Sequence, residues 1–109
     1  MQRKVGAIDH RGRGICIESE LPALERGQVQ VGVVASLISP GTELGRVKSQ
    51  REKPPGEKPP KPFGYANAGI VEKLGAGVEQ FVVGQRVACM GGGYALHADR
   101  VNVPQNLCV

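Results

Sequence analysis

The sequence predicts a mainly β domain, and three observations support this fold class. Val, Ile, Leu and Ala must build the core, because the 109 residues include no Trp, two Tyr and two Phe. Short apolar segments recur at a spacing of about ten residues, and many of the 16 glycines lie between them. The sequence shows no repeat of about 20 to 50 residues, the period found in solenoids and propellers. A single barrel or sandwich is therefore expected.

The first part of the chain is predicted to form three strands and a helix start. Residues 28–39 alternate valine with glutamine or glycine, which is typical of a half-buried strand. A strand at Gly14–Glu18 is expected to pair with Lys4–Ile8 across a turn rich in glycine and arginine. Ser39 as N-cap, with Pro40 at the first helical position, predicts one or two helical turns.

Three further strands are predicted in the second part. Ala68–Leu74 and Arg86–Met90 have the apolar pattern of strands, and Gly75–Gly77 reads as a turn between them. Tyr94–Val103 is expected to form a last, long strand. Strands of this length and spacing suit a small barrel.

The net charge of +4 comes from one segment. Residues 46–61 carry six Lys or Arg and two Glu, whereas the rest of the chain is balanced. The prolines of Lys53–Pro62 favour polyproline II and disfavour a helix or an inner strand. We expect a solvated loop over Lys48–Lys61 that moves on fast timescales. Docking of a proline motif to a partner and attraction of phosphate are the alternatives. The segment has no aromatic residue, which argues against nucleic-acid binding.

The cysteines and the hydropathy indicate a cytoplasmic protein without membrane association. Cys16, Cys89 and Cys108 form no Cys-x-x-Cys pair, so neither a disulfide framework nor a thiolate zinc knuckle is predicted. No apolar run approaches the ~20 residues that a membrane span requires.

Two glycine motifs and two histidines were candidates for chemistry. Gly75–Gly77 lacks the third glycine of a dinucleotide fingerprint, and Gly91–Gly93 lacks the following lysine and helix of a phosphate cradle. His10 and His97 have no Asp, Cys or second His at metal-ligand spacing. His97 is interpreted either as an ordinary strand residue or as a polar group in a cleft.

A series of motifs in a fixed order gives the chain a recognisable pattern over residues 28–109. The motifs lie at Ser36–Glu43, Gly64–Gly69, Arg86–Cys89 and Tyr94–Ala98. This order resembles the GroES-like substrate domain of the medium-chain dehydrogenase/reductase superfamily. The motifs are most similar to a branch with some members fused to a glucose-fructose oxidoreductase-like unit and associated with polysaccharide metabolism.

The resemblance implies a partly open, GroES-like β-barrel with one or two short helices, spanning residues 1–109. It implies hydride transfer between NAD or NADP and an alcohol or carbonyl substrate, of sugar origin in the branch named above. A downstream Rossmann domain, absent from this chain, would hold the cofactor. The 109 residues alone are therefore expected to bind no cofactor and to be inactive. Apolar surface left uncovered by that domain could also favour self-association into a homo-oligomer.

The chain departs from the zinc alcohol dehydrogenases of this superfamily at the zinc ligands. Their cysteine position is occupied by Pro40, and their histidine and glutamate positions by Tyr65 and Ala66. Proline and alanine carry no ligating side-chain atom, and a neutral tyrosine is a poor zinc ligand. Of the four structural-zinc cysteines, only Cys89 falls in the matching region. No zinc is expected.

Without zinc, hydrogen-bond donors in a dry cleft would have to polarise the substrate. The resemblance implies that Thr42 occupies the proton-relay position and that Tyr65 and Asn67 line the same cleft. Glu43, at the family's Asp position, is a second candidate contact or a structural partner for a backbone amide or an arginine. The structural alternatives are that Thr42 stabilises the helix start, Tyr65 packs in the core and Asn67 holds a turn.

A competing interpretation is a non-enzymatic binding module that acts through the basic, proline-rich loop, as the co-chaperonin GroES uses its mobile loop. The motifs at Ser39–Glu43 and Gly64–Gly69 belong to the dehydrogenase pattern and favour the oxidoreductase interpretation.

Overall fold

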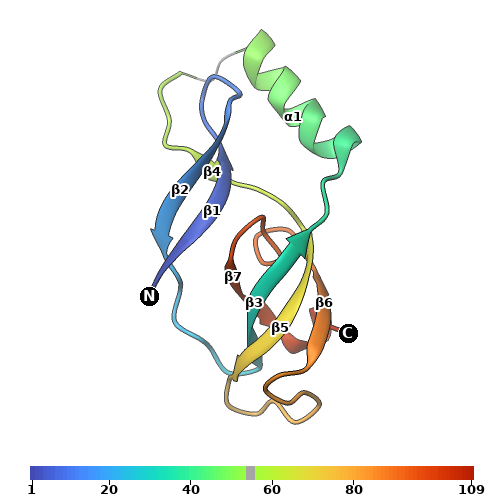
Figure 1. Cartoon of the computed structure of the whole chain (residues 1–109). Helices are drawn as coiled ribbons and strands as arrows, with labels where there is room; N and C mark the ends of the chain where they lie inside the picture. Colours follow the sequence, from blue (N-terminus) through green and yellow to red (C-terminus); the bar gives the residue numbers. More distant parts are fainter. Residues whose placement is uncertain (54–55) are drawn as a thin grey trace.

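The computed structural model describes residues 1–53 and 56–109, which form two antiparallel sheets with a helix beside one of them (Figure 1). The elements are β1 (Gln2–Ile8), β2 (Gly14–Glu20), β3 (Gln28–Ser36), α1 (Pro40–Glu52), β4 (Lys61–Pro62), β5 (Ala66–Leu74), β6 (Arg86–Met90), β7 (Arg100–Pro104) and a 3-10 turn at Gln105–Leu107. One sheet has the order β2-β1-β4 and the other β6-β5-β3-β7. The predicted mainly β, partly open fold is confirmed.

The first sheet is built on the predicted hairpin, which is longer than expected. β1 and β2 pair antiparallel in a register that places Val5 opposite Ile17. The Asp9 carboxylate closes the turn: its Oδ1 accepts the backbone N–H groups of Arg11 and Arg13, each at 2.9 Å. These hydrogen bonds, together with the guanidinium of Arg13, hold the pKa of Asp9 below its ordinary value.

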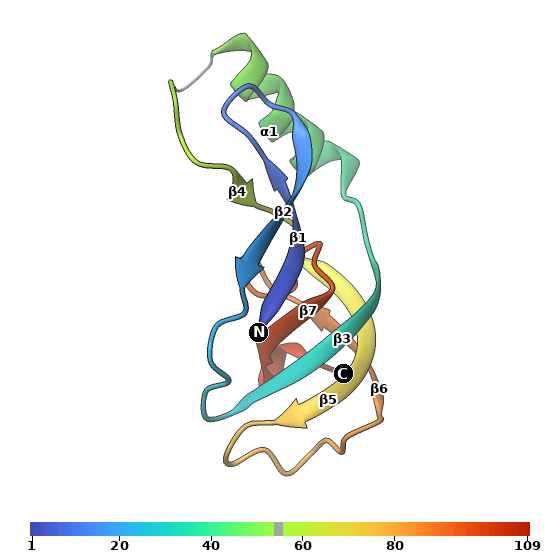
Figure 2. The same ribbon diagram turned by 60° about the vertical axis from the view of Figure 1, so that its left-hand side comes forward.

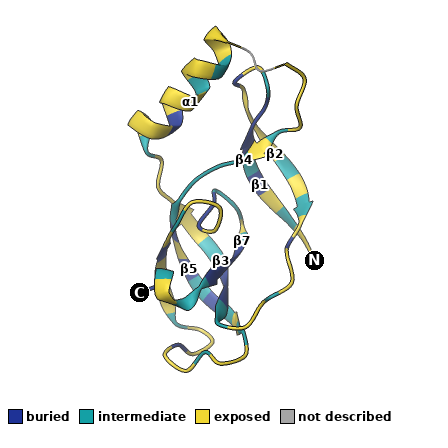
Figure 3. Cartoon of the chain, turned by 180° about the vertical axis from the view of Figure 1, so that it is seen from behind, coloured by how far each residue is buried: buried dark blue, intermediate teal, exposed yellow. Residues whose placement is uncertain are grey.

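The second sheet contains most of the core. Its fully buried side chains are Val29, Val31, Val71, Val101 and Val103. Figure 3 shows the contrast between these strands and α1, which is exposed along most of its length. The strands predicted in residues 28–39, at Ala68–Leu74 and at Arg86–Met90 are found as β3, β5 and β6. After β7, the chain returns to the free edge of β6, where Ala88 and Val109 exchange two backbone hydrogen bonds of 2.8 and 2.9 Å.

The helix is longer than the predicted one or two turns. It begins at Pro40, directly after Ser39 as expected, but runs for 13 residues to Glu52. Arg, Lys, Gln and Glu dominate its second half, and these residues have high helix propensity. Lys48–Glu52 is therefore helical, not part of a loop. None of the described helices is long and apolar enough to cross a bilayer.

The proline-rich segment contains a short strand at its end. Pro54 and Pro55 lie outside the described residues. Lys61 and Pro62 form β4, which pairs with Ile8 and Ala7 at the edge of the first sheet. An edge position tolerates proline because that edge needs no N–H donor.

The predicted long strand at Tyr94–Val103 is wrong in its first half. Tyr94 and Ala95 both donate their backbone N–H to the carbonyl of Gly91, at 3.2 and 2.9 Å, which makes a turn instead of a ladder. Gly91 and Gly93 have φ values of 128° and 81°, a region that favours glycine. The strand β7 starts only at Arg100. His97 consequently lies in a loop between the sheets.

Candidate functional site

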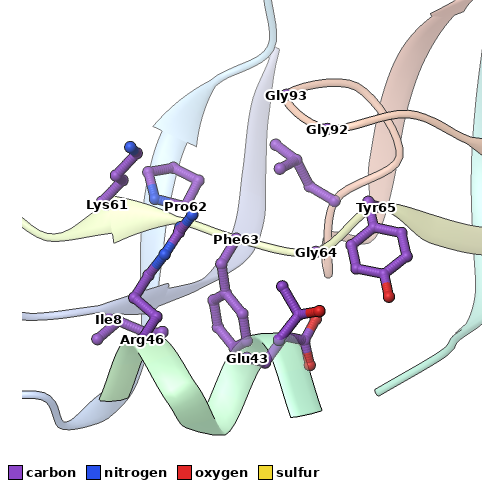
Figure 4. A pocket seen from close by; sticks show the side chains of 12 residues that line it. Ile8, Glu43, Arg46, Lys61, Pro62, Phe63, Gly64, Tyr65, Gly92 and Gly93 are labelled. Carbon is purple, nitrogen blue, oxygen red and sulfur yellow. The ribbon is translucent and has the colours of Figure 1, made fainter. Parts of the chain in front are cut away.

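The two sheets and α1 meet at a cleft of about 380 Å³. Figure 2 shows α1 and the upper part of the first sheet extending away from the second sheet, while the lower end of β1 lies against it, where Val5 joins the core. The cleft lies at this junction and is lined by Ile8, Thr42, Glu43, Arg46, Lys61, Pro62, Phe63, Gly64, Tyr65, Gly92, Gly93 and Leu96 (Figure 4). Its walls come from four parts of the chain that are distant in sequence.

Three of the four predicted site residues, Thr42, Glu43 and Tyr65, line this cleft. Thr42 lies in the first turn of α1, whose position is set by Pro40. Tyr65 lies on the segment between β4 and β5, and its carbonyl accepts the N–H of Gly91 at 2.8 Å. That bond fixes Tyr65 against the glycine loop on the opposite wall. Both hydroxyl-bearing residues are thus held by backbone contacts.

Glu43 is bound to two groups that the sequence did not place together. Its Oε2 accepts the backbone N–H of Ser39 at 3.1 Å, which caps the helix. Its Oε1 lies 2.7 Å from Nε2 of His97, and both side chains are about nine-tenths buried. The interpretation of Glu43 as a partner of a backbone amide agrees with the first contact; the predicted arginine is replaced by a histidine.

The imidazole of His97 bridges α1 and β3. Its Nδ1 lies 2.6 Å from the hydroxyl oxygen of Ser36, and its Nε2 faces the carboxylate of Glu43. A carboxylate only accepts, so Nε2 carries the proton and donates it to Glu43. In the neutral imidazole, Nδ1 then accepts the hydroxyl proton of Ser36. His97 is therefore not a strand residue; it lies outside the cleft lining and borders a neighbouring hollow instead.

Phe63 completes this cluster. Its ring makes an edge contact with the His97 imidazole at 4.7 Å between centroids, and its carbonyl accepts the N–H of His97 at 3.0 Å. Phe63, Ile8 and Glu43 also line a second, more open hollow of about 520 Å³ that lies against Ile38, Leu44 and Val47. Phe63 and Glu43 thus form a partition between the two hollows.

The cleft is positively charged at its rim. Arg46 on α1 and Lys61 on β4 both line it. The single carboxylate of the lining, Glu43, accepts hydrogen bonds from Ser39 and His97. In Figure 4, Arg46 rises from α1 toward Pro62, while Phe63, Gly64 and Tyr65 follow one another along the wall. With two cationic side chains and one carboxylate, the lining keeps a net positive charge that would favour an oxygen-rich or anionic ligand.

Asn67 does not line the cleft. It is buried on β5, and its Nδ2 donates to the carbonyl of Leu96 at 2.9 Å. Its Oδ1 has no hydrogen-bond partner. Since Leu96 lines the cleft, Asn67 holds the wall instead of facing the ligand. This placement fits the turn-holding alternative for Asn67.

By the resemblance, the zinc-ligand positions of zinc alcohol dehydrogenases correspond to Pro40, Tyr65 and Ala66. The N–H of Leu37 donates to the carbonyl of Ala66 at 2.9 Å, so the chain passes Ala66 three residues before it reaches Pro40. None of these side chains suits zinc, because two carry no donor atom and the third is a phenol. Within residues 1–53 and 56–109, no three His, Cys, Asp or Glu side chains gather at metal-binding distance.

His97, Phe63, Arg46 and Lys61 were not predicted as site residues. The sequence did contain a signal for His97, because it is part of the Tyr94–Ala98 motif. Its partner Glu43 lies 54 positions earlier, however, so only the fold reveals the pair. Arg46 and Lys61 were visible only as part of the basic segment.

The comparison with known families gives a clear result. Residues 25–109 match the alcohol dehydrogenase GroES-like domain. This match covers well over half of the chain, so the protein belongs to that family. A search of curated proteins found no significant sequence match.

Solved structures share the fold along the whole chain. The quinone oxidoreductase of Coxiella burnetii aligns with a TM-score of 0.75 at 19% identity, covering 100% of this chain and 37% of that one. An alcohol dehydrogenase superfamily protein of Novosphingobium aromaticivorans gives 0.75 at 23% identity, covering 98% and 33%. The 2R,3R-butanediol dehydrogenase of Bacillus subtilis gives 0.73 at 19% identity, covering 98% and 40%. The chain therefore spans only between a third and two fifths of the length of these relatives.

Proposed function

We propose that this chain is the substrate-binding domain of a zinc-independent, NAD(P)-dependent oxidoreductase that acts on an alcohol or carbonyl substrate. The observation that carries this proposal is the cleft itself. It is lined by Thr42 and Tyr65, which both carry hydroxyl groups, whereas Pro40 and Ala66, at two of the positions that hold zinc in zinc-type relatives, offer no ligand. A second region of a longer polypeptide, of the Rossmann type, would hold the nicotinamide, which supplies or takes up the hydride.

In this proposal Thr42 and Tyr65 do the work that zinc does elsewhere in the superfamily. Their O–H groups would donate to the substrate oxygen and stabilise the charge that develops on it. Thr42 would also pass the proton of the reacting hydroxyl out of the cleft. Both residues line the cleft in the absence of any substrate.

Glu43 and His97 act as positioning residues. Glu43 follows Thr42 directly, and its two hydrogen bonds tie the first helical turn to Ser39 and to His97. Through this contact, the helix that carries Thr42 is fixed against the β6-β5-β3-β7 sheet. Asn67 serves in the same way for the opposite wall, through its bond to Leu96.

Arg46 and Lys61 point to a substrate with several oxygen atoms. Glu43 offsets only one of their two charges, so hydroxyl-rich or anionic molecules would be favoured over purely apolar ones. A sugar-derived alcohol or aldehyde has this character. The cytoplasm is the expected location, since the cysteines are free thiols.

The surface next to the cleft fits the packing of a further domain. Four apolar residues between the end of β3 and the first turns of α1 are at least 60% exposed: Val34, Leu37, Ile38 and Leu44. An apolar surface of this kind is unusual on an isolated domain. We assign it to contact with the Rossmann domain, or to self-association when that domain is missing.

The proposal is tested by ligand titration followed by amide NMR. A panel of short-chain alcohols, aldehydes and monosaccharides is added to the isotopically labelled chain, and the shifted residues are mapped. We expect shifts at Thr42, Tyr65, Gly92 and Gly93, weakened in T42A and Y65F. The matched control is S19A, because Ser19 lies on β2 and is not one of the residues that line the cleft. Shifts confined to residues 53 and 56–61 of the basic, proline-rich segment would instead support the binding-module interpretation.

A further inference from the structure

Two buried cysteines face each other across the closure of the second sheet. Cys89 lies on β6, and Cys108 follows the 3-10 turn after β7. The two residues are paired antiparallel, both are more than nine-tenths buried, and their sulfur atoms are 3.7 Å apart. The third cysteine, Cys16, is exposed on β2.

The backbone places this pair in the geometry that a disulfide needs. Ala88 and Val109 exchange both backbone hydrogen bonds, so Cys89 and Cys108 form the adjacent pair without hydrogen bonds. In such pairs the Cα atoms are about 4.5 Å apart and the side chains are close. That separation lies within the range that disulfides span, so the sulfur atoms can join without moving the strands far.

We propose that Cys89 and Cys108 form a reversible cross-strand disulfide when the protein meets a small-molecule disulfide such as oxidised glutathione. The proposal does not depend on the oxidoreductase function. In a reducing compartment both residues remain thiols, and the bond forms when the ratio of oxidised to reduced small thiol rises. The site is thus a modification site, with a low-molecular-weight disulfide as the oxidant.

The reaction proceeds in two exchanges. The Cys108 thiolate attacks one sulfur of the small disulfide, forms a mixed disulfide and releases one thiolate. Cys89 then loses its proton, attacks the Cys108 sulfur and displaces the second thiolate. Both released thiolates take up a proton, so two protein thiols are oxidised and one small disulfide is reduced to two thiols. The S–H of Cys89 donates to Cys108 and keeps the pKa of Cys108 below its ordinary value, which favours Cys108 as the first nucleophile.

The bond would act on the wall of the cleft. Residues 90–107 lie between the two cysteines, and they include Gly92, Gly93 and Leu96 of the cleft lining. A disulfide at this position closes that segment into a loop and joins the edge of β6 covalently to the chain that follows β7. Oxidation would therefore restrict the opening of this wall.

The test uses the C16A variant of the full 109-residue chain, so that the exposed cysteine forms no adduct. The folded protein is equilibrated with buffers of increasing ratio of oxidised to reduced glutathione, trapped by alkylation and analysed by mass spectrometry. We expect an intramolecular species about 2 Da lighter, without glutathione. Trypsin cleaves after Arg86 and Arg100, so the disulfide should join peptide 87–100 to peptide 101–109.

Controls and a second measurement separate the possible outcomes. C16A/C89S and C16A/C108S should yield no such species and should stop at the free thiol or the glutathione adduct. The Tm of oxidised C16A should rise by about 10 °C, since the bond constrains the unfolded chain. The proposal is overturned if folded C16A keeps both thiols at the most oxidising ratio while the denatured chain is modified. It is equally overturned if the linked form melts below the reduced form.

Discussion

The two parts of the molecule that border the cleft are stabilised in different ways. The β6-β5-β3-β7 sheet buries five valines completely, on β3, β5 and β7. Helix α1 buries only one side chain, and it is the charged Glu43. Apolar burial thus stabilises the sheet, whereas polar contacts attach the helix, such as Glu43 to His97 and Arg51 to the carbonyl of Gly12 at 3.2 Å.

This difference shows how a small domain combines a rigid frame with an adjustable wall. Each of these contacts to an ionised side chain contributes about 1.5–3 kcal/mol, similar to one buried valine, but the helix has few such contacts and the sheet has five buried valines. The helix can therefore be changed or shifted while the sheet remains folded. Thr42 and Arg46 lie on the adjustable side of the cleft, and Gly92, Gly93 and Leu96 on the other.

The largest expected effect is in the sheet. In G69A, the new methyl group would overlap the carbonyl oxygen of Gly32 on the neighbouring strand and lie 2.9 Å from Cγ1 of Val31. Backbone atoms of a central strand cannot give way, so we expect a loss of at least about 3 kcal/mol in the free energy of unfolding. The control is G45A in α1, where a methyl group meets nothing within 4 Å. There the free energy should rise by about 0.5–1 kcal/mol. Urea denaturation measures both, and equal effects would contradict the contrast between the regions.

A smaller effect is expected where the helix meets the sheet. E43A removes the acceptor of His97 and of the Ser39 N–H, and should lower the free energy of unfolding by about 1.5–3 kcal/mol. E52A in the same helix removes an exposed contact to Lys48 at 4.0 Å. This variant should change the free energy of unfolding by less than about 0.5 kcal/mol. Hydrogen exchange should show faster opening of α1 in E43A only. Identical exchange in the two variants would show that Glu43 does not hold the helix.

A local pH effect is expected in the hairpin. Hydrogen bonds from the backbone of Arg13 and Arg11, and the Arg13 guanidinium, depress the pKa of Asp9 in the folded protein. A depressed carboxyl pKa stabilises the fold above the unfolded value of about 3.9. That contribution is lost as the pH falls through the lower folded pKa. Amide exchange of β1 and β2, corrected for its intrinsic pH dependence, should therefore accelerate in acid. In D9N this acceleration should be absent; its persistence would assign the effect to another carboxyl.

The strands of the sheet could be predicted because valines alternate with polar residues along β3 and because glycines mark the ends of β5. The length of α1 could not, since the prolines after Glu52 suggested a loop that began earlier. The first half of the predicted last strand failed because Gly91 and Gly93 adopt positive φ angles that a local pattern does not reveal. For the site, Thr42, Glu43 and Tyr65, which the resemblance singled out, line one cleft, and their contact with a substrate stays a prediction. The pairing of Glu43 with His97 depends on contacts between distant segments.

The central claim is that this member of the alcohol dehydrogenase GroES-like family builds its site without zinc, and the zinc content of the purified chain tests it most directly. The chain is incubated with excess zinc, desalted and measured by elemental analysis, beside the variant P40C/Y65H/A66E, which restores the donor set of the zinc-type relatives. We predict far less than one zinc per wild-type chain and a higher content in the variant, because only the variant offers thiolate, imidazole and carboxylate ligands. One tightly bound zinc per wild-type chain would contradict the account.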